Sequence, residues 1–536
     1  MESGDGSSSL SRRQLLRMIG ATAGSAAMYQ AMSSLGLAAE STYRGPIDLQ
    51  GAPRGASILI LGAGMAGLTA AYELRNAGYK VQLLEYNARP GGRNWTLRGG
   101  DRYTEMGGHT QQCEFDKDLY INPGPWRIPY HHHGMMHYTK LLGVPLEPFF
   151  QVNYNAYLHS SQAFGGKPQR FREVKADYQG HIAELLAKAT RQNSLDAAVT
   201  KEDQEMLLES LREWGALDSN YAYTASGASS DRRGYEKNPG GGLSARPIFS
   251  KPMALHDVLD SGLWSGVANG DTFDMQTALF QPAGGMGRIS EAFARELGPV
   301  IRYNAKVTDI HQDERGVTVA FTDSRQPGAP QTVRADWCLC TIPLPILAQI
   351  PMNVGQAMAS AISAVPYAAA IKAGLQFKRR FWEEDEKIFG GITYTDLPIM
   401  NIGYPNTGFQ CGGKGVLLGA YVWGLRAMEF TAMAPPERVK KIVDYGSQIH
   451  PQYPREFENG VAVAWHRVPF SMGCFGMWTS ATRAKHYDDL CQIDGRIALA
   501  GEHASFLGGW QEGAVTSALD AIGRLHQHAV AQGEKA

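Results

Sequence analysis

Two short apolar runs in the first part of the chain are separated by a helical pattern. The runs cover residues 58–61 and 81–84, and their length and composition are typical of buried parallel strands. Residues 68–76, which lie between them, are predicted to form a helix. This order predicts a strand–helix–strand unit, in which a crossover helix joins two parallel strands.

Three glycines and one acidic residue suggest what this unit binds. Gly62, Gly64 and Gly67 follow the first run at the GxGxxG spacing, and Glu85 ends the second run. Gly62 allows a tight turn, Gly64 lets a pyrophosphate approach the backbone, and Gly67 lets helix and strand pack closely. The helix start favours phosphate, and Glu85 can accept hydrogen bonds from a ribose. We therefore predict a dinucleotide site, and these residues alone leave NAD and FAD open.

The middle of the chain has a different pattern. Residues 182–186 and 206–214 carry apolar side chains at helical spacing among many charges. Residues 226–242 are rich in Gly, Ser, Arg and Asn and are predicted to be a loop. This part of the chain is therefore predicted to be a helical insertion.

Strand patterns return after the insertion. A glycine-rich stretch precedes a helix predicted over residues 289–297, and residues 335–341 are predicted to form a buried strand. Near the C-terminus, another strand ends in Gly501 and Glu502, and the glycine-rich residues 508–514 lead into a helix. Because the first and last segments both look nucleotide-related, we predict one domain that is built from separated segments.

Composition and charge narrow the possible functions. The chain has 536 residues, so two or three packed regions are expected. Its net charge of −1 gives no reason to expect nucleic acid as a partner. The six cysteines match no zinc spacing, and Cys338 and Cys340 lie in a predicted buried strand, where packing is the expected role. The apolar runs are too short or too interrupted to span a membrane, so we expect no membrane anchor.

The first 40 residues resemble a targeting segment. Arg12 and Arg13 precede a weakly apolar stretch rich in Ala, Gly and Met, with small residues at Ala38 and Ala39. The paired arginines are similar to those of a twin-arginine signal, which exports proteins already folded around a cofactor. We expect a periplasmic or secreted protein; the alternative is an ordinary amphipathic N-terminal helix on a cytoplasmic protein.

Motifs spread over about residues 57–526 resemble those of flavin-dependent amine oxidases, and most closely those of the L-amino acid oxidases. The motifs of the wider superfamily lie at residues 62–67, Glu85, 89–93, 284–287, 340–343, 501–502 and 509–514. The motifs of the amino acid oxidase branch lie at residues 124–129, 381–385, 395–398, 404–406 and Tyr421.

The resemblance implies an α/β and α+β fold. It would contain a Rossmann-like FAD-binding domain of the glutathione-reductase type, a substrate domain with a mixed sheet, and the helical insertion. The implied boundaries are residues 55–113, 276–350 and 488–536 for the FAD-binding domain, 114–165 and 351–487 for the substrate domain, 166–275 for the insertion, and 1–40 for the signal segment.

The resemblance also implies that the cofactor is FAD. Glu85 would hold the adenosine ribose, Val307 would contact the adenine side through its backbone, and Glu502 would bind the ribityl–pyrophosphate portion. The helix that begins after Gly509 would place its N-terminus against the flavin, where partial positive charge stabilises the reduced anionic ring. The cofactor residues implied in this way are Gly62, Gly64, Met65, Ala66, Gly67, Glu85, Tyr86, Arg93, Gly124, Pro125, Trp126, Arg127, Val307, Glu502, Gly509, Trp510, Gln511, Glu512, Gly513 and Ala514.

Cys474 raises the question of a covalent flavin. It falls where related monoamine oxidases carry a cysteine that is bonded to the flavin, whereas amino acid oxidases usually bind FAD without that bond. We therefore expect non-covalent FAD.

The substrate residues follow from the chemistry of an amino acid and from the family positions. A guanidinium matches a carboxylate with two hydrogen bonds, and Arg127 occupies the family position for that contact. Tyr421 would add a hydrogen bond from its hydroxyl group. Trp510, next to Gly509, would form an aromatic wall over the flavin with Phe475 opposite, where the two rings orient a neutral amine and exclude water.

Lys372 is the predicted catalytic residue. It lies in an otherwise apolar run, where a lone charge needs a reason. In the family, a lysine at this place reaches flavin N5 through a water and is linked to imine hydrolysis or oxygen reduction. The alternative is a solvent-facing residue in the alternation of a strand.

The resemblance predicts oxidative deamination of L-amino acids. A hydride would pass from Cα to flavin N5, the imino acid would hydrolyse to a 2-oxo acid and ammonia, and molecular oxygen would become hydrogen peroxide. The alternatives are a decarboxylating amino acid 2-monooxygenase, an amine or polyamine oxidase, and a flavin-bearing interaction protein without enzymatic activity. A homo-oligomer, as a dimer, is expected.

Two local features leave alternatives open. His131, His132, His133 and His137 suggest a metal site, but no carboxylate or cysteine nearby in the sequence completes it, so we expect no metal and histidines that line a loop near the substrate entrance. In addition, either residues 107–109 or Gly124 with Pro125 can be the turn that contacts the flavin.

Overall fold

The computed structural model describes residues 40–195, 199–243, 245–326 and 328–533. The predicted signal segment lies almost wholly outside the described residues. No helix among the described residues is long and apolar enough to cross a membrane. Described parts of the chain contain six cysteines and no disulfide between them.

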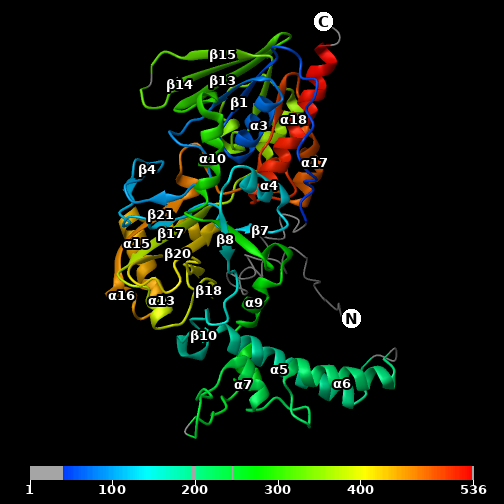
Figure 1. Ribbon diagram of the computed structural model, residues 1–536, viewed down its shortest axis with the longest axis vertical. Helices are drawn as coiled ribbons and strands as arrows, with labels where there is room; N and C mark the ends of the chain where they lie inside the picture. Colours follow the sequence, from blue (N-terminus) through cyan, green and yellow to red (C-terminus); the bar gives the residue numbers. More distant parts are fainter. Residues whose placement is uncertain (1–39, 196–198, 244, 327, 534–536) are drawn as a thin grey trace, which may run out of the picture.

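A five-stranded parallel sheet forms the upper body of the molecule (Figure 1). Its central strand β1 pairs with β16, although the two strands are far apart in the sequence. The order across the sheet is β12 (Ile301–Arg302), β2 (Lys80–Leu84), β1 (Ser57–Leu61), β16 (Trp337–Cys340) and β22 (Ile497–Leu499). The predicted strands at 58–61, 81–84 and 335–341 are confirmed.

The alternation of side chains along β1 explains how this sheet is covered. Ile58 and Ile60 pack against helices, whereas Leu59 and Leu61 pack on the opposite face. The helical face is covered by α3 (Met65–Asn76), α10 (Gly287–Leu297) and α18 (Gln511–Gly533). The other face is covered by the antiparallel sheet β13 (Ala305–Asp313), β14 (Gly316–Asp323) and β15 (Gln331–Ala335), together with α11 (Leu344–Leu347) and α12 (Gln356–Ala364).

A seven-stranded mixed sheet forms the second body. Its neighbouring strands are antiparallel except for β9 and β18, which run parallel. The order is β10 (Gln169–Arg170), β9 (Tyr157–His159), β18 (Ile392–Thr395), β19 (Asn401–Gly403), β20 (Gly415–Trp423), β17 (Ala370–Phe377) and β21 (Phe457–Ala464). The small sheet of β7 (Ile128–Pro129), β11 (Leu279–Pro282) and β8 (Leu146–Phe149), together with α4 (His133–Leu141), lies between the two bodies (Figure 1).

Helices α5 (Phe171–Arg191) and α6 (Lys201–Gly215) extend away from both sheets as an arm (Figure 1). They contain the apolar patterns predicted to be helical. The loop predicted at 226–242 is wrong in part, because residues Gly227–Arg233 form helix α7. Ser226 and Ser229 form a capping box at its start, and Arg233 at its end is paired with the buried Asp177. Tertiary contacts and a local cap therefore stabilise a helix that the composition disfavours.

Candidate functional site

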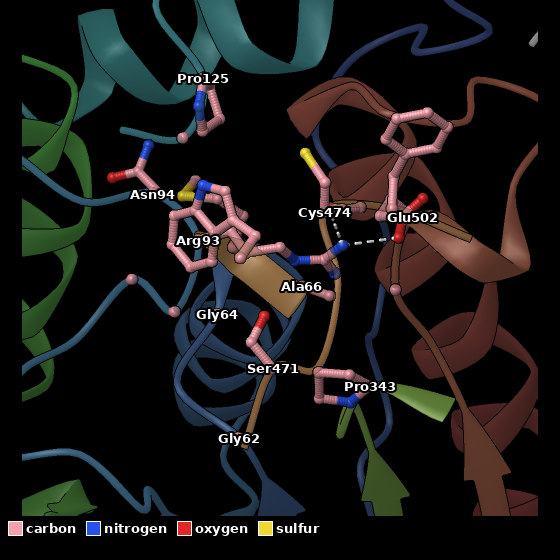
Figure 2. Close-up of a pocket in the computed structure, with 18 of the residues that line it drawn as sticks. Gly62, Gly64, Ala66, Arg93, Asn94, Pro125, Pro343, Ser471, Cys474 and Glu502 are labelled. Carbon is pink, nitrogen blue, oxygen red and sulfur yellow. Dashed lines mark hydrogen bonds and ion pairs between the residues drawn. The ribbon is translucent and has the colours of Figure 1, made fainter. Parts of the chain in front are cut away.

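A cavity runs from the carboxyl ends of β1 and β2 to the face of the mixed sheet. At the first end its walls include Gly62, Glu85 and Val307, and at the other end they include Lys372 and Trp510. Figure 2 shows the middle portion, where Arg93 points toward Glu502 beside Cys474. The two bodies of the fold thus contribute opposite ends of one elongated site.

The glycine turn leaves room for a ligand at the start of α3. A Cβ atom on Gly64 would meet nothing within 4 Å, and no side chain caps the helix there. In contrast, a Cβ atom on Gly67 would lie 1.9 Å from the carbonyl oxygen of Gly62. Gly62 has a φ of +101°, which favours glycine. Open space in front of a helix N-terminus fits a pyrophosphate.

Glu85 is held in place at the end of β2. Its carboxylate accepts hydrogen bonds from the backbone N–H of Ala63 at 2.7 Å and of Asn87 at 2.8 Å. Beside it, the ring of Tyr86 stacks on Phe470, with centroids 3.7 Å apart. Asn87, Tyr86 and Phe470 line the cavity together with Glu85, at the end where a ribose and an adenine would fit.

An ion pair crosses the middle of the cavity. One Arg93 nitrogen lies 2.8 Å from Glu502 and also donates to the backbone carbonyl of Cys474 at 2.6 Å (Figure 2). Glu502 accepts two further hydrogen bonds, from the backbone N–H of Gly476 at 3.1 Å and of Gly509 at 3.3 Å. These contacts fix both charged groups next to the path that a pyrophosphate and a ribityl chain would follow.

Lys372 lies at the centre of β17, a strand in which every residue is buried. The alternative of a solvent-facing lysine is wrong, because Lys372 itself is 3% exposed, on a strand that lies between β20 and β21. The amine donates to the carbonyl of Gly124 and lies 4.2 Å from the Tyr421 ring centre and 4.7 Å from that of Trp126. Burial lowers the pKa of Lys372 to about 7, with Cys474 opposing this shift and Arg127 adding to it.

Arg127 is a buried cation among aromatic rings. Its guanidinium carbon lies 5.5 Å from the Trp510 ring centre and 5.6 Å from that of Trp126. One nitrogen lies 3.0 Å from the sulfur of Met275. The turn that precedes Arg127 packs tightly against the backbone of Arg93. A Cβ atom on Gly124 would lie 1.9 Å from the Arg93 carbonyl oxygen, so only glycine allows this approach.

The remaining predicted substrate residues line the same end of the cavity. Trp510, Phe475 and Gly509 all contribute to its wall, and Gly509 has a φ of +77°. The rings of Tyr421 and Trp423 lie 3.8 Å apart on β20. Arg127, Lys372 and four aromatic side chains thus surround a space that is suited to a small ligand with one anionic and one apolar part.

The two candidate turns lie in different surroundings. Gly124 and Pro125 line the cavity, whereas Gly107 and Gly108 lie in the β4–β5 hairpin, where Gly107 packs against Arg467. The hairpin strands are β4 (Arg102–Thr104) and β5 (Thr110–Gln112).

Most of the predicted cofactor residues line the cavity, but Gly67, Glu512 and Gly513 do not. Glu512 is fully buried and accepts hydrogen bonds from the hydroxyl of Ser41 and from the backbone N–H groups of Gly134 and Met135. It therefore joins the start of α18 to the start of α4. A Cβ atom on Gly513 would lie 2.4 Å from the Leu507 carbonyl oxygen, so this glycine permits close packing.

The expectation that no carboxylate accompanies the histidines is wrong. Asp274, far away in the sequence, lies 3.1 Å from His131 Nε2 and 3.9 Å from His132 Nε2. Both histidines are 1% exposed, so they are buried rather than placed at an entrance. Burial lowers the pKa of His132 to about 3, and burial raises the pKa of Asp274 against the opposing effects of His131 and Arg127. His133 instead contacts Glu40.

Several residues of the site have no motif in the sequence. Phe470 and Ser471 belong to a loop, and Asn94 bonds to Gln511 across the cavity wall. Met275 and Asp274 come from the segment that was predicted to be an insertion. Trp423 also lines the cavity and was not predicted to do so. The sequence does offer a signal for this residue, because it stands two positions after Tyr421 on the same strand.

The comparisons with known proteins agree with this geometry. A putative L-amino-acid oxidase (YobN) of Bacillus subtilis is 28% identical over 475 residues, covering 86% of this chain and 93% of that protein. An L-amino-acid oxidase of Siganus canaliculatus is 27% identical over 489 residues, covering 88% and 85%.

Two solved amine oxidases have a similar fold. A variant of putrescine oxidase has a TM-score of 0.58 at 18% identity, covering 88% of this chain and 99% of that chain. Cyclohexylamine oxidase from Brevibacterium oxydans has a TM-score of 0.58 at 16% identity, with the same coverage. The model of the flavin-containing amine oxidoreductase family matches residues 65–525. With its parallel and mixed sheets in the amine oxidase arrangement, this chain belongs to the flavin-containing amine oxidoreductase family.

Proposed function

We propose that the protein is an FAD-dependent L-amino acid oxidase. It would convert an L-amino acid, molecular oxygen and water into a 2-oxo acid, ammonia and hydrogen peroxide. The observation that carries this proposal is Arg127, a buried guanidinium at the aromatic end of the cavity, across from Lys372 and Tyr421. The guanidinium can bind a substrate carboxylate with two hydrogen bonds, and an amino acid brings that carboxylate whereas a simple amine does not.

FAD fits the cavity in one orientation. The space in front of Gly64 would take the pyrophosphate, Glu85 would bind the ribose, and Arg93 would lie along the chain toward the ring. When bound, FAD supplies the acceptor for the hydrogen and electron pair that leave the substrate Cα. The parallel sheet with its three segments would be the FAD-binding domain, and the mixed sheet would carry the substrate side.

The side chains at the far end would orient the substrate. Arg127 would bind the carboxylate with two hydrogen bonds, and the Tyr421 hydroxyl would add a third. Trp510 and Phe475 would confine the amine and keep water away from it. Lys372, whose pKa is about 7, would take a proton from the water that adds to the imino acid.

The names of the relatives favour this proposal. The relative from Siganus canaliculatus is named an L-amino-acid oxidase and the relative from Bacillus subtilis a putative L-amino-acid oxidase, and both match most of the chain. The solved neighbours are named as oxidases of putrescine and cyclohexylamine, neither of which has a carboxylate, and they support an amine oxidase as the second candidate. A decarboxylating 2-monooxygenase would use the same carboxylate contact.

Product analysis distinguishes these three reactions. The purified flavoprotein is incubated with each L- and D-amino acid and with the corresponding amines in oxygenated buffer. We expect a 2-oxo acid, ammonia and peroxide in equal amounts from L-amino acids. An amide with carbon dioxide would establish the monooxygenase, and peroxide from amines alone would establish an amine oxidase.

A further inference from the structure

His131, His132 and Asp274 form a compact cluster beside the substrate end of the cavity. One ligand atom from each residue, a ring nitrogen or a carboxylate oxygen, lies within 4.8 Å of the other two. His131 and His132 come from the turn between β7 and α4, and Asp274 comes from the short helix η3 (Phe273–Met275). Two imidazoles and one carboxylate are a donor set that zinc proteins use.

Burial and an unused nitrogen distinguish this cluster from an ordinary group of polar residues. All three residues are at most 1% exposed. The Nε2 atom of His132 has no hydrogen-bond partner among the described residues, although it points toward Asp274 at 3.9 Å. A buried polar atom without a partner costs free energy, and a ligand that fills the gap removes that cost.

The distances need only a small adjustment to hold a metal ion. Four ligands at about 2.1 Å around a tetrahedral ion are about 3.4 Å apart. The contact between His131 and Asp274 is 3.1 Å, the contact between His132 and Asp274 is 3.9 Å, and all three ligand atoms lie within 4.8 Å of one another. The side chains must therefore draw together by at most about 1.4 Å to close around an ion. Three protein ligands leave the fourth position for water.

The donor set also selects the class of ion. Two imidazoles favour zinc and its transition-metal neighbours, whereas calcium and magnesium prefer six or more oxygen ligands. The positive charge of Arg127, which faces Asp274, opposes any cation here, so only an ion with strong affinity for imidazole nitrogen would compete. We propose that His131, His132 and Asp274 bind one divalent ion of the zinc class. This proposal does not depend on which substrate the enzyme oxidises.

The position of the site links it to the substrate end. The His132 ring lies 5.0 Å from the Trp510 ring at nearly a right angle, and the Trp510 indole donates toward Asp274. A metal ion on Asp274 would therefore draw this carboxylate away from Trp510 and Arg127. The site lies behind the wall of the cavity rather than in it, because none of its three residues lines the cavity.

Zinc titration of the intact flavoprotein tests the proposal. The purified protein is treated with a chelator, exchanged into clean buffer and titrated with zinc chloride by calorimetry. We expect one saturable site per chain, and at least about tenfold weaker binding in Asp274→Asn and in His132→Gln. His133→Ala removes the exposed neighbouring histidine and should leave the affinity unchanged, and magnesium chloride should not bind.

Cobalt gives a second readout in the wild-type protein, in case the variants fail to fold. Cobalt bound by two nitrogens and one oxygen in tetrahedral geometry absorbs at longer wavelength than the flavin, and zinc should displace that absorption. The proposal is overturned if no saturable site appears, if the cobalt spectrum is that of the hydrated ion, or if His133→Ala abolishes binding while Asp274→Asn retains it.

Discussion

Lys372 and Tyr421 are register partners on neighbouring strands β17 and β20, with the lysine amine 4.2 Å from the centre of the tyrosine ring. Lys372 is 3% exposed, and burial is the first cause of its pKa of about 7. The face of the Tyr421 ring and the carbonyl oxygen of Gly124 replace some of the interactions with water that the amine loses on burial. This pairing places a group that gains and loses a proton near neutral pH at the substrate end.

The buried lysine should make the stability of the protein depend on pH. Between pH 7 and pH 10 the unfolded chain holds a proton on Lys372 that the folded protein has lost, so stability rises with pH. We expect the free energy of unfolding of the wild type, relative to Lys372→Met, to rise by up to about 1.4 kcal/mol per pH unit in this window. Denaturant unfolding of both proteins with saturating FAD at pH 6, 8 and 9.5 measures the difference.

Lys378→Met is the matched control, because it removes an exposed lysine just beyond the end of β17. A difference between wild type and Lys372→Met that stays constant from pH 6 to pH 9.5 would contradict the lowered pKa of Lys372. In turnover, Lys372→Met should lower kcat by at least about tenfold, because it removes the group that moves the proton.

Two neighbouring glycines should separate cofactor binding from folding. Gly64→Ala adds a methyl group to open space at a φ of −73°, so the stability of the flavin-free protein should hardly change. The same methyl group would occupy the proposed pyrophosphate space, and FAD affinity should fall by at least about tenfold, which corresponds to 1.4 kcal/mol. Flavin fluorescence titration and thermal unfolding measure the two effects.

Gly67→Ala is the comparison for this prediction. Its Cβ atom would lie 1.9 Å from the Gly62 carbonyl oxygen, so the contact between helix and strand must open. We expect a clear loss of thermal stability before any cofactor is added. If Gly64→Ala destabilised the flavin-free protein as much as Gly67→Ala, the open space assigned to the pyrophosphate would be wrong.

The thiol of Cys474 should stay unbonded to the flavin. Burial raises the pKa of Cys474 to about 11, so the reactive thiolate is scarce at neutral pH. Acid precipitation should therefore leave a colourless protein pellet and a yellow supernatant, and Cys474→Ser should behave in the same way. A yellow pellet from the wild type, lost in Cys474→Ser, would show a covalent bond.

The parts of the site that could be predicted from the sequence are those built by local backbone geometry. The roles of Gly62, Gly64 and Glu85 could be predicted, because all three belong to one strand–turn–helix–strand unit of about 25 residues. Arg127 and Tyr421 could be found only through family resemblance, since a lone arginine or tyrosine carries no pattern.

The parts that could not be predicted depend on contacts between distant segments. Asp274 and His131 are in contact although they are 143 residues apart in the sequence, and no motif near either residue predicts this contact. Likewise, helix α7 is stabilised in part by Arg233, which pairs with Asp177 in α5. Periodicity and composition describe a segment and its immediate neighbours in the sequence, so they do not predict contacts between segments that only the folded structure brings together.

The most direct test of the central claim is anaerobic reduction of the flavin by matched substrates in the wild type and in Arg127→Ala. Each L-amino acid is compared with the amine that lacks only its carboxylate, and the loss of flavin absorbance is followed by stopped flow. We expect the wild type to reduce faster with the amino acid, and Arg127→Ala to lose about 2–5 kcal/mol of that preference while its rate with the amine hardly changes. An equal effect of Arg127→Ala on both substrates, or no reduction by any L-amino acid, would contradict the account.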